Sequence, residues 1–183
     1  ALGDHEKWLK NGSVGPRIAV NITGRQITRE HSIKRILDVL EELAPAPNVL
    51  QLDLEITETA IEGTERTINI INTLKNRGVM FAIDDFGAGH SSLSRLKQLP
   101  VDTLKIDRSF IRDIAKEGDD KAIAAAIIAM AHSLGMRVIG EGVETESQLD
   151  ILRALDCDEI QGFYFSKPVP AGEIARLLEK LFH

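Results

Sequence analysis

The feature that most constrains this chain is a regular alternation between short apolar runs and longer segments of helical period. After an opening helical stretch over residues 1–16, the two patterns change places six times. Short apolar runs bounded by polar residues predict buried strands, and a helix between successive strands is typical of parallel pairing. The sequence therefore favours an α/β fold built on a parallel sheet or barrel.

The predicted strands cover residues 17–22, 49–56, 79–84, 103–106, 137–141 and 159–161. The predicted helices cover residues 32–43, 58–77, 91–98, 119–134, 146–155 and 171–181. Gly78 and Gly135 mark helix ends, whereas Asp119 and Asp120 mark the start of an alanine-rich helix. Six βα units are two short of a closed eight-stranded barrel, so either the sheet is open or the chain is a fragment. No linker interrupts the pattern, which predicts one domain over residues 1–183.

Composition narrows the possible partners and location. The 22 basic and 28 acidic residues give a net charge of −6, which argues against DNA binding by charge alone. A phosphate ligand would need cations to help. The single cysteine, Cys157, excludes an internal disulfide and is interpreted as a core residue. No signal-peptide pattern or membrane-length apolar run occurs, so we expect a cytoplasmic segment without direct membrane contact, whether or not its parent is tethered to a membrane sensor.

Polar residues stand where nearly every predicted strand ends. They are Asn21, Glu55, Glu58, Asp84, Asp85, Lys105, Asp107, Glu141, Glu144 and Gln161. Each one alone could be a helix cap, a turn residue or a solvated charge. Because parallel strands end at one edge of the sheet, we expect these side chains to gather there. Gathered carboxylates raise one another's pKa unless a cation neutralises them, so the cluster predicts a metal site.

The donor types indicate which metal. Asn, Asp and Glu oxygens favour Mg²⁺ or Mn²⁺ over zinc. Adjacent Asp84 and Asp85 can reach separate cations only where strand alternation breaks, and the segment at 86–89, Phe-Gly-Ala-Gly, supplies that break. Two cations with Lys105 nearby match two-metal phosphoryl transfer. An enolase-like enzyme with Lys105 as the base is an alternative.

Six ordered segments resemble the motifs of EAL domains. They are VNIT at 20–23, LEITE at 54–58, DDFGAG at 84–89, LKIDRSF at 104–110, EGVET at 141–145 and QG at 161–162. The resemblance implies a TIM-like eight-stranded barrel whose first strand runs antiparallel. It also implies hydrolysis of cyclic di-GMP to linear pGpG with Mg²⁺ or Mn²⁺.

The same resemblance implies a role for each strand-end residue. The implied metal ligands are Asn21, Glu55, Asp84, Asp85 and Glu141, with Asp84 shared between two ions. Lys105 would orient or activate the attacking water and stabilise developing charge. Glu58 would anchor the loop after Asp85, which in the family couples metal binding to dimerisation. The positions implied to support the site or contact the ligand are Asp107, Glu144 and Gln161.

The chain departs from the family pattern in two places. The loop after Asp85 reads Gly-Ala-Gly-His at 87–90, where the family usually has Gly-Thr-Gly-Tyr, so His90 replaces a phenol. No Glu-Ala-Leu segment occurs, and residues 1–16 resemble the helix before the family's third strand. We therefore expect a partial EAL domain that lacks two strands, a metal-binding glutamate and a substrate-binding arginine. Such a fragment should be impaired and should self-associate, as a homodimer or otherwise.

The resemblance leaves two possible functions for the parent domain. The parent domain is either a cyclic di-GMP phosphodiesterase or a non-catalytic cyclic di-GMP receptor or protein-interaction module. Degenerate EAL domains usually lose several metal ligands. Every implied ligand within the covered region is present here, which favours the enzyme.

Overall fold

The described part of the computed structural model comprises residues 17–43, 52–60, 64–89, 93–116 and 118–182. Within it, six parallel strands form one sheet in sequence order. The strands are β1 (Ile18–Asn21), β2 (Leu52–Thr57), β3 (Val79–Phe86), β4 (Thr103–Ile106), β5 (Arg137–Glu141) and β6 (Glu159–Gln161). This order confirms the predicted succession of parallel strands.

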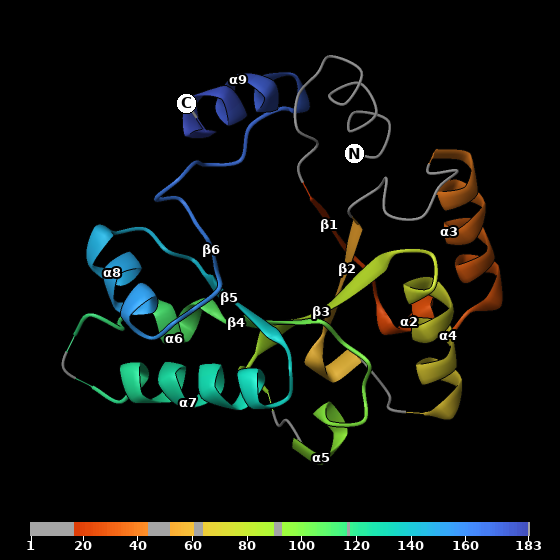
Figure 1. The fold of residues 1–183 in the computed structure, drawn as a ribbon, viewed down its shortest axis with the longest axis horizontal. Helices are drawn as coiled ribbons and strands as arrows, with labels where there is room; N and C mark the ends of the chain where they lie inside the picture. The colour runs from red at the N-terminus through yellow and green to blue at the C-terminus, as the bar shows by residue number, and fades with distance from the viewer. Residues whose placement is uncertain (1–16, 44–51, 61–63, 90–92, 117, 183) are drawn as a thin grey trace.

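Helical segments connect the strands. They are α2 (Gly24–Ile27), α3 (Glu30–Leu43), the 3₁₀ turn η1 (Glu58–Ala60), α4 (Glu65–Lys75), α5 (Leu93–Leu96), α6 (Arg108–Arg112), α7 (Asp120–Ser133), α8 (Glu146–Ala154) and α9 (Ala171–Phe182). The sheet curls into an incomplete TIM-like barrel with helices around its outside (Figure 1). Among the described helices, none combines the length and the apolar character that a membrane crossing requires.

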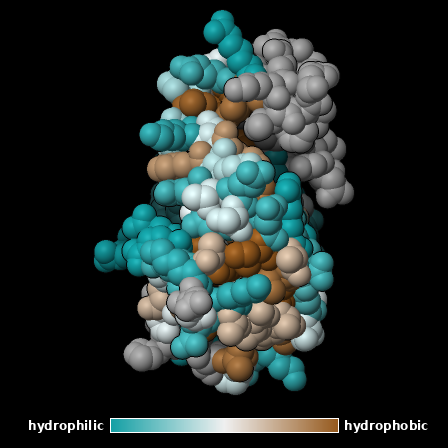
Figure 2. Space-filling model, turned by 90° about the vertical axis from the view of Figure 1, so that its left-hand side faces the viewer, coloured by the Kyte–Doolittle hydropathy of each residue, from teal (hydrophilic) through white to brown (hydrophobic). Residues whose placement is uncertain are grey.

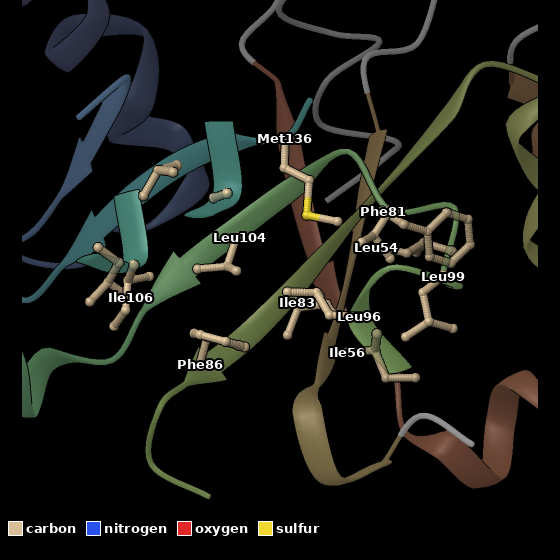
Figure 3. Packing of buried hydrophobic residues seen from close by; sticks show 14 of the residues in the cluster. Leu54, Ile56, Phe81, Ile83, Phe86, Leu96, Leu99, Leu104, Ile106 and Met136 are labelled. Atoms are coloured by element: carbon tan, nitrogen blue, oxygen red, sulfur yellow. The ribbon is translucent and has the colours of Figure 1, made fainter. Parts of the chain in front are cut away.

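The apolar core lies between the outer face of the sheet and the helices. Strand alternation explains it, because Leu54 and Ile56 of β2 point to this face, while Asp53 and Glu55 point to the inner face. Figure 3 shows the same arrangement continuing through Ile83 and neighbouring strands. Each fully buried side chain of this size stabilises the fold by roughly 1.5–3 kcal/mol.

Charged residues occupy the inner face at the amino ends of the strands. Arg17 Nε lies 3.1 Å from Asp53 Oδ2. Both Arg17 and Arg137 also form ion pairs with Glu159. Arg17 directly precedes β1 and Glu159 begins β6, so these contacts join the first and last strands of the sheet. We call Arg17, Asp53, Arg137 and Glu159 the amino-end cluster.

Local chemistry corrects several predicted boundaries. The helix predicted over 58–77 is wrong at its start, because η1 occupies 58–60 and α4 begins only after Thr64. The Thr64 side chain caps α4 by accepting a hydrogen bond from Thr67 N. Strand β3 runs two residues beyond its predicted end, to Phe86. The short helices α2 and α6 were not predicted, since four or five residues carry no measurable helical period.

The remaining predicted elements are confirmed within the described residues, with boundary shifts of one or two residues for most. Of the helix predicted over 91–98, the structure describes only residues 93–98, and α5 covers Leu93–Leu96 and ends two residues early. The predictions for residues 1–16, for residues 49–51 and for His90 lie outside the described residues. The fold is thus one curled sheet, and the polar ends of its strands lie at the edge where the sequence predicts the site.

Candidate metal centre and active site

Lys105 lies at the centre of the predicted site. Its side chain comes from β4 and is only 2% exposed. Its Nζ atom is 2.7 Å from Glu55 Oε1, 3.0 Å from Asp84 Oδ1 and 2.6 Å from Glu141 Oε1. Residues from four neighbouring strands therefore converge on one ammonium group.

Strand alternation brings these four side chains to the same face. Leu104 and Ile106, which flank Lys105, are fully buried on the helix side of the sheet. Lys105 must then point to the inner face. Glu141 ends β5 in the same way, two residues beyond Ile139, which pairs in register with Lys105. Parallel strands thus deliver their polar ends to one mouth of the barrel.

A bulge in β3 allows adjacent aspartates to share the site. Ile83 pairs with Leu104 and Phe86 pairs with Ile106, so Asp84 and Asp85 together oppose Lys105 alone. Asp85 adopts a positive φ of 54°. The break in alternation was predicted for residues 86–89, and it instead begins at the aspartate pair itself. The physical reason is the extra residue in the strand, which turns both carboxylates toward the same end.

Gly87 continues this turn. Its φ is 95°, and a Cβ atom there would lie 2.7 Å from Cε2 of Phe110. Only glycine meets both requirements without strain. Gly87 N also donates a 3.4 Å hydrogen bond to Glu58 Oε2. Glu58 thus contacts the loop that the sequence assigned to it.

Three carboxylates form a group that could hold a cation. Asp84, Asp85 and Glu141 each offer an oxygen, and these oxygens lie within 4.8 Å of one another. Burial raises the pKa of Asp85 and of Glu141, and neighbouring carboxylates raise both further. Asp84 Oδ1 is buried, and its partner among the described residues is the Lys105 ammonium, 3.0 Å away. Three crowded carboxylate oxygens are hard donors, and they fit a divalent cation such as Mg²⁺ or Mn²⁺.

Ion pairing keeps Lys105 charged. Burial alone would lower its pKa, but the contacts with Glu141, Glu55 and Asp84 outweigh burial and raise it. The side chain is therefore an ammonium at neutral pH and acts as a hydrogen-bond donor.

Asp107 supports the site from the start of α6. It caps the helix by accepting a 2.9 Å hydrogen bond from Ser109 N. Burial tends to raise its pKa, yet the hydrogen bonds from Ser109 lower it overall. Asp107 and Asp85 also interact through their side chains, and Asp107 contributes to the raised pKa of Asp85. The two aspartates thus act as a coupled pair at the mouth of the barrel.

The other predicted residues lie at the same mouth but outside this contact network. Asn21 ends β1 in register with Glu55 and is exposed. Gln161 ends β6 in register with Glu141 and is exposed. The side chain of Glu144 is exposed in the loop after β5.

Sequence reasoning missed Gln148. It is buried, and it contacts the loop that follows Glu141. The signal was available, because Thr145 and Gln148 form a Thr-x-x-Gln capping box at the start of α8. Capping boxes usually act locally, so the box alone did not indicate a link to the site.

The fold and the site define a TIM-like barrel protein with an acidic centre suited to divalent cations. The family follows from comparison with known proteins. The model of the EAL domain matches residues 1–168, and the chain belongs to this family. This membership confirms the resemblance drawn from the six motifs.

Two relatives from Pseudomonas aeruginosa illustrate the similarity. The bifunctional diguanylate cyclase/cyclic di-GMP phosphodiesterase MucR is 39% identical over 168 residues, which cover 91% of this chain and 24% of MucR. The cyclic di-GMP phosphodiesterase NbdA is 42% identical over 163 residues, which cover 88% of this chain and 21% of NbdA. The chain thus spans about a quarter or less of these relatives.

Solved structures agree with the fold. The EAL domain of Mycobacterium smegmatis DcpA matches with a TM-score of 0.90 and 37% identity, covering 98% of this chain and 81% of that one. A MucR phosphodiesterase in complex with c-di-GMP has a TM-score of 0.85 and 38% identity, covering 95% and 70%. A manganese and cyclic di-GMP complex of Klebsiella pneumoniae BlrP1 has a TM-score of 0.76 and 30% identity, covering 90% and 42%.

Proposed function

We propose that the EAL domain to which this chain belongs hydrolyses cyclic di-GMP to linear pGpG. The observation that carries this proposal is the convergence of Glu55, Asp84 and Glu141 on Lys105, with Asp85 beside them. The names of MucR and NbdA support the substrate, because both relatives are cyclic di-GMP phosphodiesterases.

Divalent cations, Mg²⁺ or Mn²⁺, are part of this proposal. Asp84, Asp85 and Glu141 would hold one cation, and Asn21 and Glu55 would join Asp84 around a second. When bound, such cations neutralise phosphate oxygens and make an attacking water more acidic. The manganese complex of BlrP1 supports the choice of metal.

Lys105 contributes a fixed positive charge at the point of reaction. In hydrolysis, a water oxygen forms a bond to phosphorus while the bond between phosphorus and the 3′ oxygen breaks. Negative charge grows on the phosphate oxygens during this exchange. The Lys105 ammonium orients the water by hydrogen bonding and stabilises that charge. Asp107, Glu144 and Gln161 support the site or contact the nucleotide.

The 183-residue chain itself is proposed to be a single, partial EAL domain with impaired activity. Its sequence contains no Glu-Ala-Leu segment, from which the family draws a metal ligand. The described sheet is also open between β1 and β6. An open barrel admits water to the site, which weakens preorganised electrostatic stabilisation. The parent is proposed to act as a homodimer, with Glu58 holding the loop after Asp85.

The test compares two proteins at saturating Mn²⁺. One is the 183-residue chain, and the other is extended upstream by about 70 residues, roughly two βα units. We expect the extended protein to convert cyclic di-GMP to pGpG, and the shorter chain to be nearly inactive. Asp84→Asn in the extended protein should abolish turnover, because an amide cannot supply an anionic bridge between cations. Tight binding of cyclic di-GMP without product would indicate a receptor instead.

A further inference from the structure

Gln148, near the start of α8, is a buried polar side chain that the proposed reaction does not use. Only 6% of the residue is exposed. Its Oε1 accepts hydrogen bonds from Glu144 N at 2.8 Å and from Thr145 N at 3.0 Å. Its Nε2 donates a 2.9 Å hydrogen bond to the carbonyl oxygen of Arg112. One side chain therefore joins the loop after β5 to the end of α6.

This loop begins at Glu141, a member of the carboxylate group. Gly142 follows with a φ of 71°, and a Cβ atom there would lie 2.7 Å from Cβ of Arg108. The loop therefore lies directly against the first turn of α6. Helix α6 itself starts after Asp107, two residues beyond Lys105. The contact between loop and helix thus fixes two segments that carry site residues.

The opposite side of the loop is held by the segment around β6. Val143 N donates to the carbonyl oxygen of Gln161 at 3.1 Å, and Tyr164 N donates to that of Val143 at 2.9 Å. Gln148 supplies the matching attachment on the α6 side. Without its amide, Glu144 N, Thr145 N and the Arg112 carbonyl would lose the part-buried hydrogen bonds that tie the loop to α6. The loop would then be attached on one side only.

A second capping glutamine shows what is special about Gln148. Gln26 forms the same box with Thr23 at the start of α2, and its Oε1 accepts from Thr23 N at 2.9 Å. Gln26 is exposed, and its recorded hydrogen bonds stay within the cap. Gln148 caps its helix and also donates a hydrogen bond to Arg112, which ends α6 in the preceding βα unit. Helix capping alone therefore does not account for the part-buried hydrogen bond to Arg112.

We propose that Gln148 is a positioning residue, which holds the loop after β5 against α6 and so fixes Glu141 beside Asp84 and Lys105. This inference rests on the proposed function, since it assigns Gln148 to the geometry of the cation site. Residues that orient metal ligands typically change metal affinity by about 10–100-fold when they are altered. The expected consequence is a loss of cation affinity that exceeds any loss of fold.

The test measures the Mn²⁺ affinity of the upstream-extended protein by titration followed with electron paramagnetic resonance. Gln148→Leu should weaken the affinity by about tenfold or more, while circular dichroism shows an unchanged helix content. Gln148→Glu keeps both accepted bonds but loses the donor to Arg112, and should weaken the affinity by at least about threefold. The matched control, Gln26→Leu, removes a capping glutamine without a link to another unit and should leave the affinity unchanged.

The outcomes separate this inference from the function on which it rests. Absence of Mn²⁺ binding by the unaltered extended protein would overturn the proposed cation site, and the role of Gln148 with it. Binding of Mn²⁺ by the unaltered extended protein, with equal affinity in its Gln148→Glu variant, would overturn the role of Gln148 alone. An equal loss in Gln26→Leu would also overturn it, because the effect would then belong to helix capping. If Gln148→Leu does not fold, Gln148→Glu and Gln26→Leu still decide the question.

Discussion

Lys105 is a buried cation that the protein surrounds with three carboxylates. Such an arrangement combines two functions in one side chain. It neutralises repulsion between Glu55, Asp84 and Glu141, and it presents a charged donor at the mouth of the barrel. The buried location makes the charge effective, because water screens it little.

Lys105→Ala should lower kcat of the upstream-extended protein by about 10²–10³-fold, as does the loss of other preorganised donors. KM should stay within about threefold, since the interaction strengthens mainly in the transition state. Steady-state kinetics with cyclic di-GMP and Mn²⁺ would measure both constants. Lys116→Ala is the control, because Lys116 is exposed and pairs only with Asp113 among the described ion pairs. A large rise in KM at unchanged kcat would contradict the assigned role.

Cys157 offers a test of burial that is independent of function. Burial raises the pKa of its thiol to about 11. At pH 8 only about 0.1% of the thiol is then ionised, so reaction with Ellman's reagent should be slow in the folded chain. The rate should still rise roughly tenfold per pH unit between pH 8 and 9.5, where an ordinary thiol levels off. A rate equal to that of the urea-unfolded chain would show that the thiol is accessible.

The strands carry two kinds of polar group at their two ends. The carboxyl ends present the proposed cation site, whereas the amino ends present the amino-end cluster of two arginines and two acids. Asp53 is the most buried acid of that cluster, and its Oδ1 has no hydrogen-bond partner among the described residues. Burial raises its pKa, although Arg17 and Arg137 oppose the shift. The cluster therefore depends on its arginines to remain charged.

Arg17→Met should destabilise the chain by about 2–4 kcal/mol at neutral pH, because it strands Asp53 as a buried charge. A carboxyl whose pKa is higher in the folded than in the unfolded chain disfavours folding at high pH. This cost shrinks as the pH falls below the folded pKa and is gone below the unfolded pKa. The stability that Arg17→Met loses should therefore become smaller toward pH 4. Urea unfolding at several pH values measures it, and Asp53→Asn in the same variant should recover part of the loss. Arg77→Met, at an exposed pair with Glu41, should change stability by less than about 0.5 kcal/mol.

The curled sheet leaves β1 and β6 without a strand partner on one side within the described residues. Apolar side chains are exposed near both edges, including Val20 after the start of β1 and Phe163, Tyr164 and Phe165 after β6. Figure 2 shows hydrophobic surface on one side of the molecule. Unpaired edges with apolar neighbours favour association with another strand or another copy.

We expect the 183-residue chain to self-associate at micromolar concentration through these edges. Size-exclusion chromatography with light scattering would give the mass directly. Val20→Lys should reduce association, because a charge on an edge strand opposes pairing between sheets. A stable, monodisperse monomer for the unaltered chain would contradict the expectation.

Much of the structure could be predicted from local patterns in the sequence. Six strands, their parallel direction and the long helices follow from hydrophobic period, and the glycines at 78 and 135 mark helix ends where the structure has positive φ values. The carboxylates and Lys105 were recognisable because each stands at a strand end. The EAL motifs then assigned the family, which the match over residues 1–168 confirms.

The tertiary structure decided which of these residues touch. The hydrophobic period alone could not predict the bulge that brings Asp84 and Asp85 to the carboxyl end of β3. A bulge depends on the register with the neighbouring strand. The period also could not show that Gln148 reaches Arg112, or that Arg17 meets Glu159, since such pairs lie far apart in the chain. The local sequence determines the conformation of each segment and the side of the sheet on which each side chain lies. Contacts between distant strands and helices are fixed only when the sheet curls.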